Sequence, residues 1–191
     1  MIVEILKENL QKIATDQSRI AGQRFFKEDV IIMGVKSSDL RKLSKNLYSQ
    51  VKEKSKHELF EICTSLWQTN VMELCFVACD WTQKRKKEFV KEDFEIFENW
   101  VENYISNWAT CDTFCNHTMG DIIIQYPDLL PKLMTWTKSD NRWVRRAAAV
   151  SLIVPARKAL FIDHILNIAD CLLLDNDDMV QKGYGDRKSV V

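Results

Sequence analysis

The stretch that decides the fold is Asp140-Asn141-Arg142-Trp143-Val144-Arg145-Arg146-Ala147-Ala148-Ala149-Val150. It begins with an Asp that can cap a helix, continues with Val-Arg, and ends in small residues that let helices pack closely. A weaker version of the same pattern runs from Asp177 to Gly183, with Val180 placed 36 residues after Val144. The repetition predicts a structural unit that recurs along the chain.

Four segments after residue 56 share one order of features, namely a helix, a short polar turn and a second helix. The predicted first helices are His57–Trp67, Asp93–Tyr104, Asp128–Trp136 and Ile162–Leu174. The second helices open with Val71, Trp108, Val144 and Val180, at spacings of 37, 36 and 36 residues. A period in this range with two helices per unit is typical of an α-solenoid. The 140–150 stretch resembles the second helix of a HEAT repeat.

Apolar residues also recur at helical spacing before residue 56. They predict helices over Ile2–Ala14 and Ser18–Phe26, and a third that begins with a Ser cap at Ser37 or Ser38. The 191 residues include five Gly and three Pro, too few for an all-β sandwich or barrel. We therefore expect an all-α solenoid of HEAT-like two-helix repeats with a concave binding face.

The length predicts one domain over residues 1–191. Its parts would be N-terminal helices (1–55), repeats of about 36 residues (56–185) and an atypical tail (186–191). Six dilute cysteines suggest buried free thiols. The sequence has neither a signal-peptide pattern nor an apolar run of about 18 residues. Together with the free thiols, this favours a cytoplasmic protein without membrane spans.

Charge gives no direct support for nucleic-acid binding, because 27 Lys and Arg balance 27 Asp and Glu. Residues 1–100 hold 17 basic and 16 acidic side chains, and residues 101–191 hold 10 and 11. A curved solenoid can nevertheless segregate its charges, with basic residues on one face. The candidates for a DNA-binding face are Lys36, Arg41, Lys42, Lys45, Arg142 and Arg146.

Asp112 breaks the repeat. At an offset of 36 residues, its sister positions are Phe76, Ala148 and Tyr184. A carboxylate at a packing position must either pair with a cation or line an open surface. Trp108 lies four residues earlier, so both project from one helix face. The alternative to a functional site is that Trp108 is core and Asp112 pairs structurally with an Arg of the next repeat.

Together, three groups of residues resemble the AlkD-type DNA alkylation repair proteins, HEAT-like DNA glycosylases, over about residues 17–185. They are Met33-Gly34-Val35-Lys36 with Asp39-Leu40-Arg41, Asn107-Trp108 with Asp112 and Gly120-Asp121, and the stretch from Asn141 to Ala148. The resemblance implies excision of cationic alkylated purines, of the 3-methyladenine and 7-methylguanine type, from duplex DNA. It implies that Asp112 is the catalytic carboxylate, Trp108 packs on the deoxyribose and Arg146 holds the DNA backbone.

One position departs from the resemblance. The family has a further active-site Trp where this chain has Asp186, so we expect an altered C-terminal ending without a capping repeat. Two other hypotheses stay open, a non-catalytic HEAT-like module that binds DNA or protein, and an ordinary scaffold. No zinc signature, Gly-rich phosphate loop or nucleophile elbow occurs. We expect a monomer that needs no cofactor or metal and acts on duplex DNA containing alkylated bases.

Overall fold

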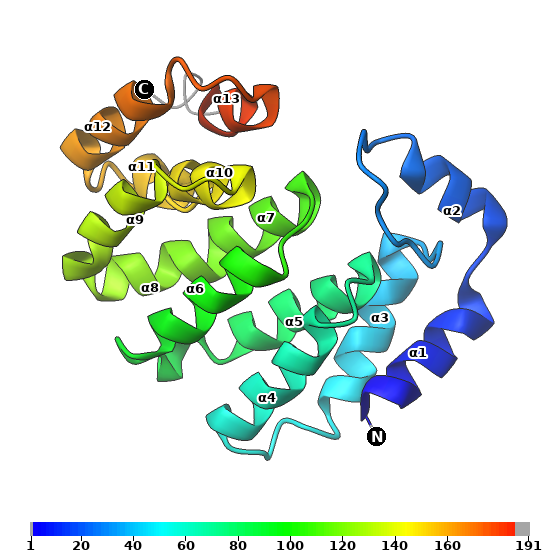
Figure 1. The fold of residues 1–191 in the computed structure, drawn as a ribbon. Coiled ribbons are helices and arrows are strands. Elements are labelled where there is room, and N and C mark those ends of the chain that lie inside the picture. Colours follow the sequence, from blue (N-terminus) through cyan, green and yellow to red (C-terminus); the bar gives the residue numbers. More distant parts are fainter. Residues whose placement is uncertain (1, 186–191) are drawn as a thin grey trace. The chain divides into compact units, whose positions relative to one another are not determined.

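The computed structural model of the protein describes residues 2–185, with the side chains of 184 and 185 left out. This part is built of helices, which confirms the all-α class and the solenoid of paired helices (Figure 1). The contacts divide the chain into two compact units, Met1–Glu88 (unit 1) and Phe89–Val191 (unit 2). The single domain over residues 1–191 stays a prediction. The expected tail with Asp186 lies outside the described residues.

In unit 1, helix α5 packs against both α3 and α4 (Figure 1). The helices are α1 (Ile2–Ile13), α2 (Asp16–Gln23), α3 (Ser37–Tyr48), α4 (Lys56–Trp67) and α5 (Met72–Lys84), followed by a 3-10 turn, η1 (Lys86–Glu88). α4 begins with a capping box, in which Ser55 and Glu58 each accept a hydrogen bond from the other's backbone N–H. The predicted Ser cap of α3 is wrong. Lys36 is the N-cap and no side chain caps this helix, so Ser37 already lies in the first turn.

A buried carboxylate fixes the chain just before α3. Glu73 is 2% exposed and accepts three backbone hydrogen bonds, from Met33 at 3.0 Å, Gly34 at 2.8 Å and Val35 at 3.2 Å. Gly34 has φ of +93°, and its carbonyl accepts the Thr15 N–H at 2.9 Å. Glu73 therefore joins α5 to the segment that leads into α3.

Unit 2 contains three of the predicted two-helix repeats. Its helices are α6 (Asp93–Asn103), α7 (Trp108–Phe114), α8 (Gly120–Gln125), α9 (Leu130–Trp136), α10 (Arg142–Val150), α11 (Ile153–Arg157), α12 (Ile162–Leu172) and α13 (Asp178–Gly185). A π-helix, η2 (Cys115–Met119), joins α7 to α8, and a 3-10 turn, η3 (Pro127–Leu129), precedes α9. α10 packs against α6, α7, α9, α12 and α13, and its three alanines at positions 147–149 are fully buried. Small side chains there allow the close approach that the sequence predicted.

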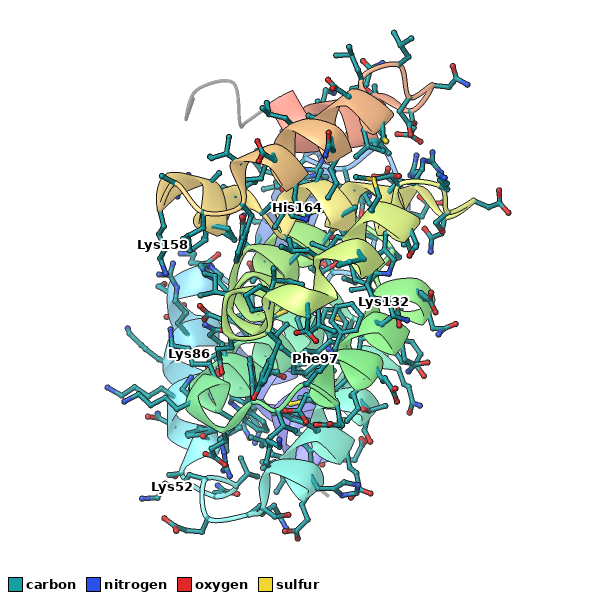
Figure 2. The ribbon with its side chains drawn as sticks, turned by 90° about the vertical axis from the view of Figure 1, so that its left-hand side faces the viewer. Lys52, Lys86, Phe97, Lys132, Lys158 and His164 are labelled. Carbon is teal, nitrogen blue, oxygen red and sulfur yellow. The ribbon has the colours of Figure 1, made fainter. Side chains whose placement is uncertain are left out.

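Aromatic rings form much of the core of unit 2. The Phe97 ring lies inside the unit (Figure 2), with centroids 5.1 Å from Phe89, 5.5 Å from Trp100 and 5.7 Å from Phe114. Phe97 and Phe114 meet edge to face, which aromatic pairs favour. Because Phe114 ends α7, this cluster fixes that helix against α6.

The six cysteines are free, as predicted, and all but the exposed Cys171 are buried. Burial raises the pKa of Cys63 to about 12 and that of Cys75 to about 12. It also raises the pKa of Cys79 and of Cys111 well above the usual value of a thiol. Across the described residues, the helices are too short or too polar to span a membrane.

The three arginines of α10 all contact α13 or the turn before it. Arg145 donates to both carboxylate oxygens of Asp175, from Nε at 2.6 Å and from Nη2 at 3.2 Å. Arg142 Nη1 donates to Asp177 Oδ2 at 3.2 Å. Burial alone would raise the pKa of Asp175, but hydrogen bonds from Arg145 and from the Asp177 N–H outweigh it and lower that pKa.

We expect Gly34→Ala to destabilise the fold. The added Cβ would lie 2.4 Å from the Thr15 carbonyl oxygen, in a backbone conformation that disfavours alanine. The expected loss of unfolding free energy is about 1–3 kcal/mol in urea denaturation. Gly22→Ala is the matched control, since its Cβ would meet Ile32 at an ordinary 3.4 Å. Equal effects of the two substitutions would contradict the strain at Gly34.

We expect Asp175→Asn to lower stability in a pH-dependent way. A lowered folded-state pKa stabilises the fold above the unfolded value of about 3.9, and this contribution is lost as the pH falls through the folded value. The variant should lose about 1–3 kcal/mol of unfolding free energy at pH 7 and progressively less below pH 4. The exposed Asp163→Asn should match the wild type throughout. A pH-independent loss in Asp175→Asn would show that ionisation is not the cause.

Candidate functional site

Helix α7 carries two of the predicted site residues on one face. The Asn107 side chain caps it by accepting the Thr110 N–H at 3.0 Å, so Trp108 is its first residue. Asp112 follows four residues later, and side chains at this spacing are neighbours on a helix. Both side chains are partly exposed. The indole and the carboxylate therefore lie side by side at the surface of unit 2.

Asp112 forms a two-point ion pair with Arg146 of α10. Arg146 Nε donates to Oδ1 at 2.7 Å, and Nη2 donates to Oδ2 at 2.7 Å. Such fork-to-fork pairs fix the plane of a carboxylate as well as its charge. The Arg146 side chain is 5% exposed, whereas that of Asp112 is 23% exposed. Two environments were expected for a carboxylate at this packing position, a cationic partner or an open surface. Asp112 has both, because it pairs with Arg146 and is partly exposed.

The rest of the Arg146 guanidinium contacts α13, where Nη1 donates a hydrogen bond to the Met179 carbonyl. All three nitrogens of the group thus donate within the protein. Arg146 is therefore the arginine of the next repeat that pairs with Asp112, as expected if this aspartate has a structural role. A contact between Arg146 and a DNA phosphate stays a prediction.

Arg142 is the most exposed of the three arginines of α10. Its guanidinium lies 4.6 Å from the centre of the Trp143 ring, and its side chain is 35% exposed beside Asp177. Stacking on an indole holds a guanidinium at the surface without removing its charge. Trp108 and Asp112 lie on α7, and Arg142 and Arg146 lie on the neighbouring α10. Of these predicted site residues, Asp112 and Arg146 contact each other directly, whereas Arg142 contacts Asp177 and Trp143.

The other predicted DNA contacts lie in unit 1, at the start of α3 and along it. Lys36, Arg41, Lys42 and Lys45 are all exposed. Arg41 Nε donates to the Ser37 carbonyl at 3.2 Å, and Lys42 lies 3.8 Å from Asp39. They belong to a different unit from Asp112, and their role in binding DNA stays a prediction.

The unit boundary reveals a charge difference that equal halves of the sequence concealed. Residues 1–88 contain 16 Lys and Arg against 12 Asp and Glu, whereas residues 89–191 contain 11 against 15. Unit 1 is therefore basic and unit 2 acidic. This charge difference runs along the chain, and the segregation of basic residues onto one face stays a prediction.

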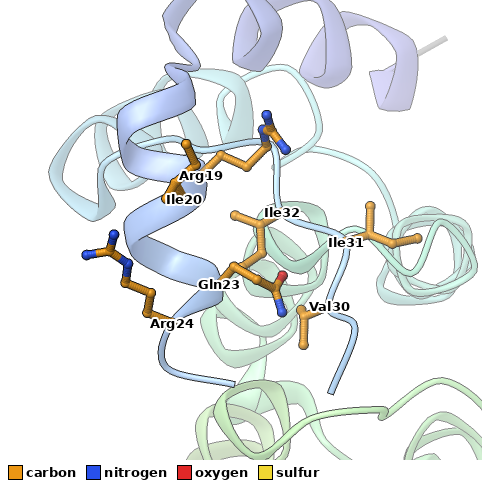
Figure 3. A pocket seen from close by; sticks show the side chains of 7 residues that line it. All are labelled: Arg19, Ile20, Gln23, Arg24, Val30, Ile31 and Ile32. Atoms are coloured by element: carbon orange, nitrogen blue, oxygen red, sulfur yellow. The ribbon is translucent and has the colours of Figure 1, made fainter. Parts of the chain in front are cut away.

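Unit 1 also contains a pocket, and none of the residues that line it was a predicted site residue (Figure 3). Its volume is about 520 Å³, and it is lined by Arg19, Ile20, Gln23, Arg24, Val30, Ile31 and Ile32. Arg19 is paired with Asp16 at 2.8 Å, and Arg24 points away from the helix in the view shown. The pocket combines aliphatic side chains with two arginines and a glutamine.

Sequence patterns also did not predict two features of unit 2. The π-helix η2 begins at Cys115, three residues after Asp112, and π-helical turns are frequent at functional sites. Gly183 of α13 packs on Arg146. It lies 36 residues after Ala147, so a small residue recurs at this position of the repeat. In the described part of the chain, no three His, Cys, Asp or Glu side chains gather as metal ligands would. That the protein needs no metal or cofactor stays a prediction.

Comparison with known proteins gives a fold relative and a family. The structure is similar to that of a predicted DNA alkylation repair enzyme from Enterococcus faecalis, with a TM-score of 0.78 and 17% sequence identity. The match covers 92% of this chain and 85% of that one, and at this identity it shows a shared fold. No curated protein matches the sequence. The model of the DNA alkylation repair enzyme family matches residues 6–186, nearly the whole sequence, and the chain therefore belongs to that family.

Proposed function

We propose that the protein is a DNA glycosylase that hydrolyses the N-glycosidic bond of cationic alkylated purines in duplex DNA. Membership of the family gives a role in DNA repair, and the proposal adds the reaction and the substrate. The observation that carries it is the Asp112 carboxylate, held at two points by Arg146 yet partly exposed beside Trp108. A carboxylate in this setting is fixed in orientation before any substrate arrives.

The chemistry needs few protein groups when the base is already cationic. A purine alkylated at N3 or N7 carries positive charge, so it leaves without protonation by an acid. The remaining task is to stabilise an oxocarbenium-like sugar and to place a water, which one carboxylate can do, as in glycoside hydrolysis. The Trp108 face would add an attraction of about 0.5–2 kcal/mol to the developing positive charge.

The ion pair leaves Asp112 able to act. Arg146 uses one lone pair of each carboxylate oxygen, and each oxygen has a second. The Asp112 side chain is 23% exposed, so a sugar and a water would approach it from the solvent. Because the arginine is fixed by its other contacts, the carboxylate need not reorganise during the reaction, which is the usual source of electrostatic catalysis.

A non-catalytic module that binds DNA is the second candidate. The observation that favours it is that Arg146 compensates the charge of Asp112 and is itself buried. On this hypothesis the pair joins α7 to α10 and has no part in chemistry. Base release by the intact protein distinguishes the two.

We expect Asp112→Asn to lose at least about 100-fold in the rate of 7-methylguanine release from alkylated duplex DNA. The amide keeps one oxygen for Arg146, places a donor NH2 where the second oxygen was, and carries no charge to stabilise the sugar cation. Asp128→Asn is the matched control, because it removes an exposed carboxylate of unit 2 that pairs with Lys91. Melting temperatures of all three proteins show whether the variants are folded.

The outcomes separate the hypotheses. Equal rates in the wild type and Asp112→Asn would remove Asp112 from the reaction. A wild type that binds alkylated DNA but releases no base would favour the non-catalytic module.

We expect binding to undamaged DNA to be weak and strongly dependent on salt, since the basic excess lies in unit 1 alone. Replacing both Lys36 and Lys45 with Gln should reduce the slope of log K against log salt concentration by about 2, at about 0.9 for each lost phosphate contact. Lys52→Gln, at an exposed lysine of the same unit beside Glu53, should leave the slope unchanged. An unchanged slope in the double variant would exclude both lysines from the interface.

A further inference from the structure

We propose that helix α13 is a positioning element for Asp112. The Met179 carbonyl and Gly183 would fix the guanidinium of Arg146 in the orientation that presents its fork to the carboxylate. The catalytic consequence rests on the proposed glycosylase function, whereas the positioning itself depends only on contacts within unit 2.

The first observation is that the three arginines of α10 dock α13. Arg145 and Arg142 pair with Asp175 and Asp177, and Arg146 donates to the carbonyl of Met179. Asp177 in turn accepts the Met179 N–H at 2.8 Å, so it fixes the backbone that carries this carbonyl. Arg146 is the one of the three that also holds Asp112.

The second observation is the close packing of Gly183 on the stem of Arg146. A Cβ at this position would lie 3.0 Å from Arg146 Cγ, 3.4 Å from Nη1 and 3.6 Å from Val150 Cγ2. The first of these distances is shorter than ordinary van der Waals contact, so glycine is the residue that fits here without moving Arg146. This packing restricts the space open to a side chain that is otherwise long and flexible.

Together these contacts give Arg146 a fixed place between two helices. Its fork faces α7, where Asp112 accepts from Nε and Nη2, and its back faces α13, where Met179 accepts from Nη1. A displacement of α13 would therefore move the guanidinium and tilt its fork against the carboxylate. Gly183 acts through Arg146, and it is a positioning residue.

The test compares Gly183→Leu, which forces Arg146 aside, with Gly183→Ala, which requires a small adjustment, and with Lys182→Leu on the exposed face of α13. The first readout needs no DNA. In ¹⁵N-labelled protein, the Nε–H resonance of Arg146 is assigned by its loss in Arg146→Gln. It should shift and exchange faster in Gly183→Leu, shift slightly in Gly183→Ala, and stay unchanged in Lys182→Leu.

The second readout is the single-turnover rate of 7-methylguanine release beside the Kd for undamaged duplex. Gly183→Leu should lower the rate by about 10- to 100-fold, the effect of misplacing a catalytic group by about 1 Å. Its Kd should change by less than about 3-fold, because four of the six predicted DNA contacts lie in unit 1, and Arg146 of unit 2 is buried. Adding Gly183→Leu to Arg146→Gln should lower the rate no further, since coupled residues are not additive.

The outcomes that overturn the proposal are specific. An Arg146 resonance unmoved by Gly183→Leu would show that α13 does not position the guanidinium. Full additivity with Arg146→Gln would show that Gly183 acts by another route. If the wild type released no base, the glycosylase function would fail, while the resonance test would still decide whether α13 positions Arg146.

Discussion

The buried guanidinium of Arg146 is the constraint around which unit 2 is arranged. A charge removed from water is tolerated only when its donors are satisfied and an opposite charge lies close by. Arg146 meets this requirement by contacts with two helices, with Asp112 on α7 and with Met179 on α13. Three elements far apart in the sequence must therefore take up fixed positions for α10 to be buried at all.

The same constraint explains how a repeat fold can carry a site. In a solenoid, equivalent positions of successive repeats usually pack against each other. Position 112 keeps its place in the repeat but exchanges an apolar side chain for a carboxylate. The small residues of α10 bring its neighbours close, so that an arginine on the next repeat reaches this carboxylate at two points. The repeat supplies the scaffold, and the exception to it supplies the polar group.

Local sequence patterns predicted much of this architecture. The apolar period predicted α4 and α6 to within one residue at each end, and comparison of the repeats singled out Asp112. Other features depend on contacts without a local pattern. The Met179 carbonyl is a backbone group that any residue would provide, so its bond to Arg146 left no trace in the sequence. The entry into α3 depends on Glu73, about 40 residues away, so the local pattern of serines does not fix where this helix begins.

The buried thiols have a consequence for a protein of this family. A thiolate is a strong nucleophile and a neutral thiol is a weak one. Burial keeps Cys63, Cys75, Cys79 and Cys111 protonated at neutral pH, since it raises the pKa of each far above 7. Methylating agents that attack the bases of DNA therefore meet four of the six cysteines of this protein in an unreactive form. These four thiols are thus poor targets for the reagents that produce the damage its family repairs.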